Sequence, residues 1–142
     1  MISELRAFLI REQAPFEVGD ADGRHFAKVV ALRDGDLYAL AVLPAASALD
    51  LIGFRRRIGR YALTVANEDE FRGQFPELAR GPLMPFGRLL GIPVYLDRGL
   101  AEETAMTFES GVAREMVSMP MRDYVRAERP AIAPLARALR AA

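Results

Sequence analysis

Hydrophobic residues gather most densely in two runs, Phe26–Leu32 and Leu37–Leu43, which a short polar segment separates. The dipeptide Asp34-Gly35 in that segment suits the positive φ angles of a tight hairpin turn. Both runs are too apolar for strands that keep one face in water. The pattern therefore predicts a central β-hairpin in a sheet that is covered on both faces.

Shorter segments around this hairpin show either helical or extended patterns. Helices are predicted at 3–13 with Ser3 as cap, 47–58 with Ser47 as cap, 67–75 with Asn67 as cap, 122–128, and in a last segment through about Leu139. Strands are predicted at 16–18, 61–65, 92–96, 104–108 and 113–119. Such a mixture, without regular βαβ alternation, predicts an α+β fold: a single domain, 1–142, with a curved mixed β-sheet flanked by helices.

Charge and composition narrow the function classes. The 19 acidic residues balance the 19 basic ones, so any contact with RNA must come from a local patch. The chain has no cysteine, which excludes disulfides, thiolate chemistry and cysteine-ligated metal. The longest uncharged run, Leu37–Leu49, is too short to span a bilayer, and Glu4 stands where an export signal would be basic. We therefore expect a soluble, cytoplasmic protein.

Lys28 is the only lysine of the chain, and it lies inside the first hydrophobic run. Buried lysines are rare and often functional, because a compact ammonium with rotatable donors acts differently from a planar guanidinium. The alternative is an edge-strand lysine that reaches water and discourages pairing between sheet edges. Composition alone does not separate these two interpretations.

Other catalytic chemistry finds little support in the residues. His25 is the only histidine, and no carboxylate cluster has the spacing of metal ligands, so no metal is expected. On a regular strand His25 points away from the face of Lys28, which argues against a dyad of the two. There is neither a P-loop nor a G-x-G-x-x-G sequence, and no cofactor is expected.

The segment Gly81–Gly87 is rich in glycine and proline, and it keeps several backbone N–H groups. Glycines let a backbone approach a ligand closely, and prolines hold it rigid. The donors are those of Leu83, Met84, Phe86 and Gly87. A stiff loop with free amides could hold a carbonyl or an oxyanion. An ordinary connection between two elements is the simpler interpretation of these residues alone.

Four arginines end the predicted helix 47–58: Arg55, Arg56, Arg57 and Arg60. Positive side chains at a helix C-terminus complement the helix dipole, which accounts for them without a ligand. The functional interpretation is a patch that binds the phosphates of RNA, formed by Arg55, Arg56 and Arg57. The dipole explanation is the simpler one from sequence.

An ordered set of short motifs resembles one known family. The motifs are AKVVAL with Lys28, LYALAVLPA, GPLMP followed by Phe86-Gly87, PVYLD, TFESG and MRDYVRAERP. In this order, from about Phe26 to Ala136, they resemble the YbaK/prolyl-tRNA synthetase-associated domain family. That family comprises free-standing aminoacyl-tRNA deacylases and the editing insertion of bacterial prolyl-tRNA synthetase.

The resemblance implies a fold and an activity. Family members have a mixed sheet ringed by helices and hydrolyse the ester of wrongly charged tRNA, without a covalent nucleophile or cofactor. Lys28 matches the essential strand lysine that anchors the aminoacyl-adenosine end. Gly81 and Pro85 match the G-x-x-x-P loop against the scissile carbonyl, and Gly111 matches the glycine of a later turn in the active site. Within the loop, Leu83, Met84 and Phe86 are expected to contact substrate.

We therefore expect a trans-editing deacylase that acts on a mischarged tRNA carrying a small amino acid. Its partners would be the 3′ end of tRNA and a synthetase, but neither membrane nor DNA. Several relatives place a histidine after the later turn, where this chain has Val112-Ala113. A non-catalytic module that binds tRNA or an aminoacyl end is therefore an alternative. An unrelated enzyme that forms a Schiff base on Lys28 is another.

Overall fold

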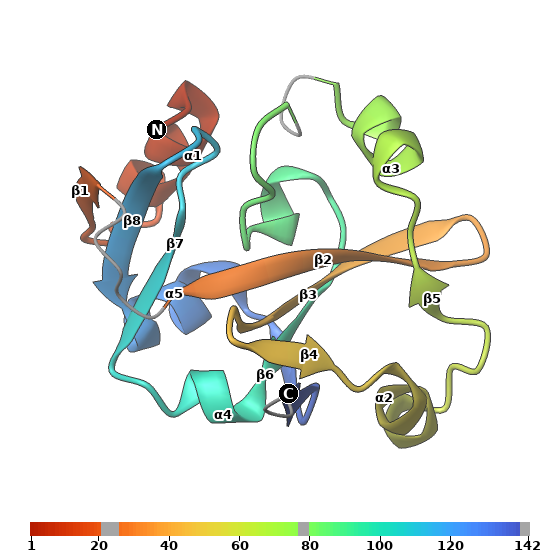
Figure 1. Cartoon of the computed structure of the whole chain (residues 1–142). Coiled ribbons are helices and arrows are strands. Elements are labelled where there is room, and N and C mark those ends of the chain that lie inside the picture. Colours follow the sequence, from red (N-terminus) through yellow and green to blue (C-terminus); the bar gives the residue numbers. More distant parts are fainter. Residues whose placement is uncertain (21–25, 77–79, 140–142) are drawn as a thin grey trace.

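The computed structural model describes residues 1–20, 26–76 and 80–139 of the chain (Figure 1). The helices are α1 (Ser3–Arg11), α2 (Leu51–Ile58), α3 (Glu68–Gln74), α4 (Arg98–Ala101), α5 (Met121–Glu128) and the 3₁₀ turn η1 (Gly87–Leu89). The strands are β1 (Glu17–Asp20), β2 (Ala27–Asp34), β3 (Leu37–Pro44), β4 (Ser47–Leu49), β5 (Thr64–Val65), β6 (Val94–Asp97), β7 (Ala105–Glu109), β8 (Glu115–Pro120), β9 (Ala131–Ala133) and β10 (Ala136–Ala138). The predicted α+β class is confirmed.

The central hairpin is formed by β2 and β3, as predicted. The two strands pair antiparallel from Ala27 opposite Pro44 to Asp34 opposite Leu37. Gly35 has a φ of +62°, which is the left-handed conformation that the turn requires. Around the hairpin the strand order is β5-β2-β3-β6-β9, and β6 and β9 join in parallel. The sheet is therefore mixed.

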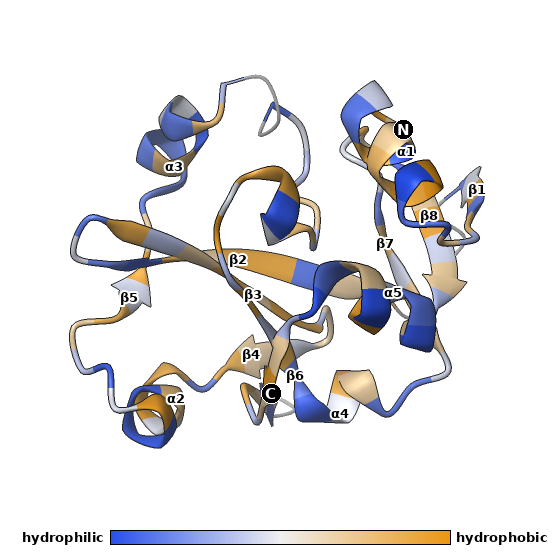
Figure 2. Cartoon of the chain, turned by 180° about the vertical axis from the view of Figure 1, so that it is seen from behind, coloured by the Kyte–Doolittle hydropathy of each residue, from blue (hydrophilic) through white to orange (hydrophobic). Residues whose placement is uncertain are grey.

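Both faces of the hairpin are covered by hydrophobic side chains. On β2, Ala27, Val29 and Ala31 belong to the larger core cluster, which includes side chains from α1 and α5. Their neighbours Val30 and Leu32 face the smaller cluster, which is built around Phe54 of α2. Because side chains alternate along a strand, β2 contributes residues to both clusters. Figure 2 shows hydrophobic colouring along β2 and β3.

A second sheet joins the N-terminal strand β1 to β7 and β8, which lie about 100 residues later in the chain. Its order is β1-β8-β7, with Glu17 opposite Ser118 and Met106 opposite Met119. Figure 1 shows α1 beside these strands. A separate antiparallel pair is formed by β4 and β10. The predicted strands 16–18, 104–108 and 113–119 correspond to β1, β7 and β8.

Two of the three predicted helix caps are wrong. Ser47 lies in β4, and α2 is capped by Asp50, whose side chain accepts a hydrogen bond from the Gly53 N–H at 3.1 Å. The residue preceding α1 is Ile2, so Ser3 begins the helix without capping it. Asn67 does cap α3, because its side chain accepts from the Glu70 N–H at 3.0 Å.

The helix expected through Leu139 is also wrong, because the segment forms β9 and β10. The cause lies in a distant side chain. Asp97, which is 6% exposed, accepts hydrogen bonds from the N–H groups of Leu135 at 2.9 Å and Ala136 at 3.0 Å. Its other oxygen accepts from the Leu100 N–H at 3.1 Å and caps α4. One buried carboxylate thus fixes the extended C-terminal segment.

Two searches of the described residues gave no result. No helix among them is long and apolar enough to cross a membrane. They also contain no group of three or more histidine, cysteine, aspartate or glutamate side chains that could hold a metal ion. His25, whose orientation was predicted from strand alternation, lies outside the described residues.

Candidate active site

The Gly81–Gly87 loop is anchored by an aromatic side chain in the larger core. Phe86 is 1% exposed and packs edge-to-face against the rings of Phe8, Phe108 and Tyr124, with centroid distances of 5.6, 5.2 and 5.3 Å. These contacts come from α1, β7 and α5. The Phe86 side chain is therefore a core anchor, and only its backbone is available to a ligand.

Side chains from other elements hold the backbone of the loop. An Arg72 guanidinium nitrogen donates to the Gly81 carbonyl at 2.6 Å. The Tyr124 hydroxyl donates to the Pro85 carbonyl at 2.7 Å. Just after the loop, the Arg88 N–H donates to both carboxyl oxygens of Glu128, at 3.2 and 3.3 Å. The loop is thus fixed at its start, at its second proline and at its end.

Several backbone N–H donors lie along this loop. The N–H groups of Leu83, Met84, Phe86 and Gly87 donate no hydrogen bond to any other residue that the structure describes. Met84, Phe86 and Gly87 are buried residues, and buried amides in proteins are almost always paired. A rigid loop with unused donors is suited to hold an anionic oxygen.

Three of the predicted site residues meet at the Gly111 turn between β7 and β8. A Cβ on Gly81 would lie closer than 3.0 Å to the Gly111 carbonyl oxygen. Gly111 has a φ of +90°, and a Cβ there would lie 3.1 Å from the Met84 Sδ and 3.2 Å from Ile2. Contact with the Gly111 carbonyl therefore requires glycine at position 81, and the positive φ favours glycine at position 111. Leu83, half-buried, packs against the same core.

Lys28 lies on the other face of β2 from the loop. Its side chain shares a face with Val30 and Leu32 of the smaller cluster, whereas Met84 and Phe86 belong to the larger one. The half-buried ammonium donates to the Ser47 carbonyl. That carbonyl is its sole partner among the described residues, so two of its three hydrogens remain available. Strand alternation thus does not bring Lys28 and the loop together.

The structure agrees with the edge-strand interpretation of Lys28 only in part. In the described sheet, β5 pairs with β2 at Leu32 and Arg33 only, so at Lys28 the strand pairs with β3 alone. The ammonium nevertheless bonds a backbone carbonyl instead of extending freely into water. Lys28 therefore combines an edge position with a half-buried hydrogen bond.

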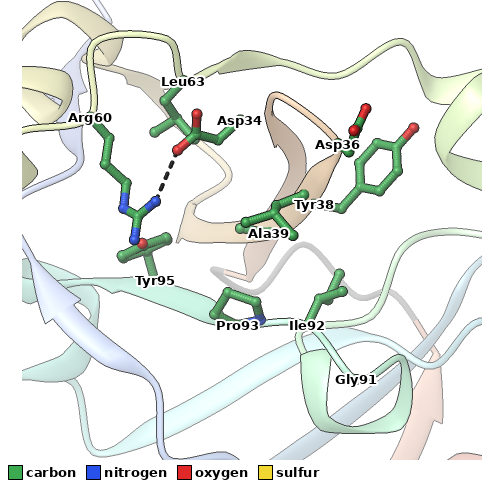
Figure 3. A pocket seen from close by; sticks show the side chains of 11 residues that line it. Asp34, Asp36, Tyr38, Ala39, Arg60, Leu63, Gly91, Ile92, Pro93 and Tyr95 are labelled. Carbon is green, nitrogen blue, oxygen red and sulfur yellow. Dashed lines mark hydrogen bonds and ion pairs between the residues drawn. The ribbon is translucent and has the colours of Figure 1, made fainter.

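Two cavities lie at opposite ends of β2. One, of about 410 Å³, lies at the Lys28 end and is lined by Phe26, Ala27, Pro44–Ala46 and by residues of the α4–β7 region: Gly99, Leu100, Glu103–Ala105 and Thr107. The other, of about 260 Å³, lies at the hairpin turn and includes the Arg60–Asp34 ion pair at 3.0 Å (Figure 3). Sequence reasoning missed the first cavity because its walls come from segments far apart in the chain.

Most of the predicted arginine patch is occupied by intramolecular contacts. The Arg55 Nε donates to the Leu63 carbonyl at 2.5 Å. Arg57 donates to the Pro134 carbonyl at 3.1 Å and lies 3.8 Å from the Asp50 carboxylate. Arg56 is exposed and makes no ion pair or hydrogen bond with the other described residues. Arg56 is therefore the member of the patch best placed for phosphate.

Glu128 makes the stability of the fold depend on pH. Burial raises the pKa of this carboxyl to about 8 from an ordinary value of 4.5, although the Arg88 N–H and charge oppose the shift. Between these values the folded chain holds a proton that the unfolded chain has lost. The free energy of unfolding should therefore fall as pH rises through this window, by at most about 1.4 kcal/mol per pH unit.

Glu128→Gln tests this dependence, because glutamine stays neutral and still offers an acceptor to Arg88. Urea unfolding between about pH 5 and pH 8 should show that the variant lacks this part of the slope and gains stability over the parent at the alkaline end. The same slope in both proteins would contradict the prediction.

Comparison with known proteins gives a family and a fold. The sequence pattern of the aminoacyl-tRNA editing domain family matches residues 14–127, more than half of the chain. That range includes Lys28, the Gly81–Gly87 loop and Gly111. No curated protein matches the chain in sequence.

Several solved structures share the fold. A candidate signal transduction protein from Marinobacter aquaeolei VT8 aligns with a TM-score of 0.83 at 23% identity, over 96% of this chain and 31% of that one. The chain thus spans about a third of that protein. A candidate trans-editing enzyme for prolyl tRNA synthetase aligns with a TM-score of 0.69 at 15% identity, over 94% and 95% of the two chains. A hypothetical protein aligns with a TM-score of 0.78 at 14% identity, over 95% and 100%.

Proposed function

Because the chain belongs to the aminoacyl-tRNA editing domain family, we propose that it is a trans-acting deacylase that hydrolyses the ester of a mischarged tRNA carrying a small amino acid. The observation that carries the proposal is the anchored loop, whose amides donate no hydrogen bond to the other residues that the structure describes. Such donors stabilise the oxyanion that forms when water adds to an ester carbonyl. No cofactor is required for this chemistry.

The proposed reaction assigns a role to each part of the site. Water attacks the ester carbonyl carbon, and the carbonyl oxygen becomes an oxyanion that accepts from the loop amides. The ester C–O bond then breaks, and the ribose oxygen of the tRNA leaves and takes up a proton. The products are a free amino acid and an uncharged tRNA. Lys28 binds the aminoacyl-adenosine end with the hydrogens that Ser47 does not use.

Packing beside the loop supports a small aminoacyl group. Gly81 lies so close to the Gly111 carbonyl that not even a Cβ fits between them, and Met84 fills the space beside Gly111. A bulky side chain bound next to these backbone groups would have to displace them. The structural neighbours include a candidate trans-editing enzyme for prolyl tRNA synthetase, which agrees with the trans-editing part of the proposal. Cytoplasmic location and contact with a synthetase belong to the same proposal.

A binding module without turnover is the second candidate. The observation that favours it is that Lys28 and the loop lie on opposite faces of β2. A panel of mischarged tRNAs, scored both for release of the amino acid and for binding, separates the two functions. Release from at least one tRNA supports the deacylase, whereas saturable binding of charged tRNA without release would replace it by the module.

Arg56→Gln tests the proposed contact with tRNA phosphates. Loss of one phosphate contact should raise the apparent KM and reduce the slope of log KM against log salt by about 1, with kcat almost unchanged. Arg137→Gln is a matched control, because it removes the same charge from an exposed position on β10. Equal salt slopes for Arg56→Gln and the parent would mean that the arginines only complement the helix dipole at a solvated helix end.

A further inference from the structure

Helix α5 directs two buried polar side chains at the two ends of the same short backbone segment. Tyr124 is fully buried and Glu128 is 3% exposed. They are four residues apart, so they lie on one face of the helix. Tyr124 bonds the Pro85 carbonyl and Glu128 bonds the Arg88 N–H. The helix therefore holds the segment Pro85–Arg88 at both ends.

The bond from Tyr124 fixes the direction of one of the unused amides. In a planar trans peptide the carbonyl and the following N–H point in opposite directions. The Pro85 carbonyl is held against the Tyr124 hydroxyl at 2.7 Å, so the N–H of Phe86 points away from α5. The Tyr124 and Phe86 rings pack edge-to-face at 5.3 Å and limit rotation of this peptide. The Tyr124 hydroxyl thus orients the Phe86 N–H without contacting it.

The bond from Glu128 closes the segment at its other end. The carboxyl accepts the Arg88 N–H, and the carbonyl of the same peptide, that of Gly87, accepts from the N–H groups of Leu90 at 2.9 Å and Ile92 at 3.0 Å. The Arg88 guanidinium also donates to the Ala127 carbonyl at 2.6 Å. Both sides of the Gly87–Arg88 peptide are therefore bonded, and the loop ends at a rigid point.

These contacts go beyond what packing alone requires. Phenylalanine and leucine would fill the same volumes without burying a hydroxyl and a carboxyl, each of which costs free energy unless it is hydrogen-bonded. The hydroxyl finds its partner in the loop, and the carboxyl finds its partner at the residue directly after the loop. We propose that Tyr124 and Glu128 are positioning residues that hold the Gly81–Gly87 loop with its amides directed at the ester carbonyl. This inference rests on the proposed deacylation.

Tyr124→Phe is the direct test, because it removes the hydroxyl and keeps the ring contacts with Phe86. With a mischarged tRNA that the parent hydrolyses, kcat should fall about tenfold, the equivalent of one hydrogen bond, while KM changes little. Amide hydrogen exchange in residues 83–87 of the tRNA-free protein should become about tenfold faster. Tyr95→Phe is the matched control, since it removes a hydroxyl at the other cavity and should leave kcat and this exchange unchanged.

A pair of variants at Glu128 tests the second contact. Glu128→Gln keeps an acceptor for the Arg88 N–H and should retain kcat near pH 7, whereas Glu128→Leu should lose it about tenfold with faster exchange at Arg88. If the leucine variant fails to fold, Tyr124→Phe decides the inference. Parental kcat and exchange in Tyr124→Phe would overturn it. So would a loss of kcat with unchanged loop exchange, which would mean that the hydroxyl acts elsewhere.

The exchange measurement also separates this inference from the proposed function. If the parent releases no amino acid from any mischarged tRNA, the deacylase proposal fails. The exchange rates of the tRNA-free variants still report whether the two side chains hold the loop, and unchanged rates would overturn the anchoring itself.

Discussion

Replacing Lys28 by alanine is expected to abolish deacylation while the fold survives. The side chain is half-buried, and its ammonium is bonded to one backbone carbonyl, that of Ser47, which can accept from water instead. Loss of the charged donor that binds the aminoacyl-adenosine end should cost about 2–4 kcal/mol of transition-state stabilisation. The measurement is kcat/KM on a mischarged tRNA, with thermal unfolding as the check on the fold.

Lys28→Arg should also abolish deacylation. This variant keeps the positive charge but places the donors differently, so it tests whether charge alone is sufficient. The guanidinium is larger and planar, and it directs its donors differently from an ammonium. Near-parental turnover by Lys28→Ala would remove Lys28 from the active site. Borohydride trapping of a carbonyl compound on Lys28 would instead support the Schiff-base enzyme.

Gly81→Ala should have the second large effect, because its methyl group meets backbone and not a flexible side chain. The new Cβ would overlap the Gly111 carbonyl oxygen, so one of the two loops must move. Overpacking of this kind costs about 1–3 kcal/mol of stability. A shift of the loop amides by about 1 Å should lower kcat by about 100-fold.

Gly73→Ala is the matched control for this substitution. Gly73 lies in α3, and a Cβ there would meet nothing within 4 Å. Alanine in a helix is favoured over glycine by up to about 1 kcal/mol, so this variant should be as active as the parent and slightly more stable. Met84→Leu, which nearly conserves volume, should also be mild. Equal losses from Gly81→Ala and Met84→Leu would mean that the loop is only structural.

Local signals in the sequence predicted those parts of the fold whose causes are local. The hairpin at Asp34-Gly35 follows from turn chemistry, and the Asn67 cap is set by the residue three positions later. The strands at the C-terminus could not be predicted, because their backbone is bonded by Asp97, 38 residues before Leu135. The sequence predicted that a helix ends at Glu128, where α5 does end, but it did not predict that two strands follow.

In the candidate site, too, the sequence indicated some features and only the structure shows the others. The resemblance selected Gly81, Pro85 and Gly111, but only the structure shows that the Gly111 carbonyl excludes a side chain from Gly81. Tyr124 and Glu128 lie in the motif MRDYVRAERP, but the motif did not indicate their contacts, since their partners lie 39 and 40 residues away. Alternation alone did not show which core the Lys28 side chain lies beside. The members of the two core clusters place it on the face of β2 that packs against the smaller one.

The pairing of β1 with β8 also sets the order in which the chain can fold. Glu17 must find Ser118, so closing this sheet costs the loop entropy of most of the chain. Domains with such distant pairings fold more slowly than helical domains of the same size. During synthesis, β1 and the neighbouring α1 have no partner strand until β8 has left the ribosome. Because Phe8 of α1 packs against Phe86, the candidate catalytic loop should mature last, and a nascent chain that lacks β8 should be inactive.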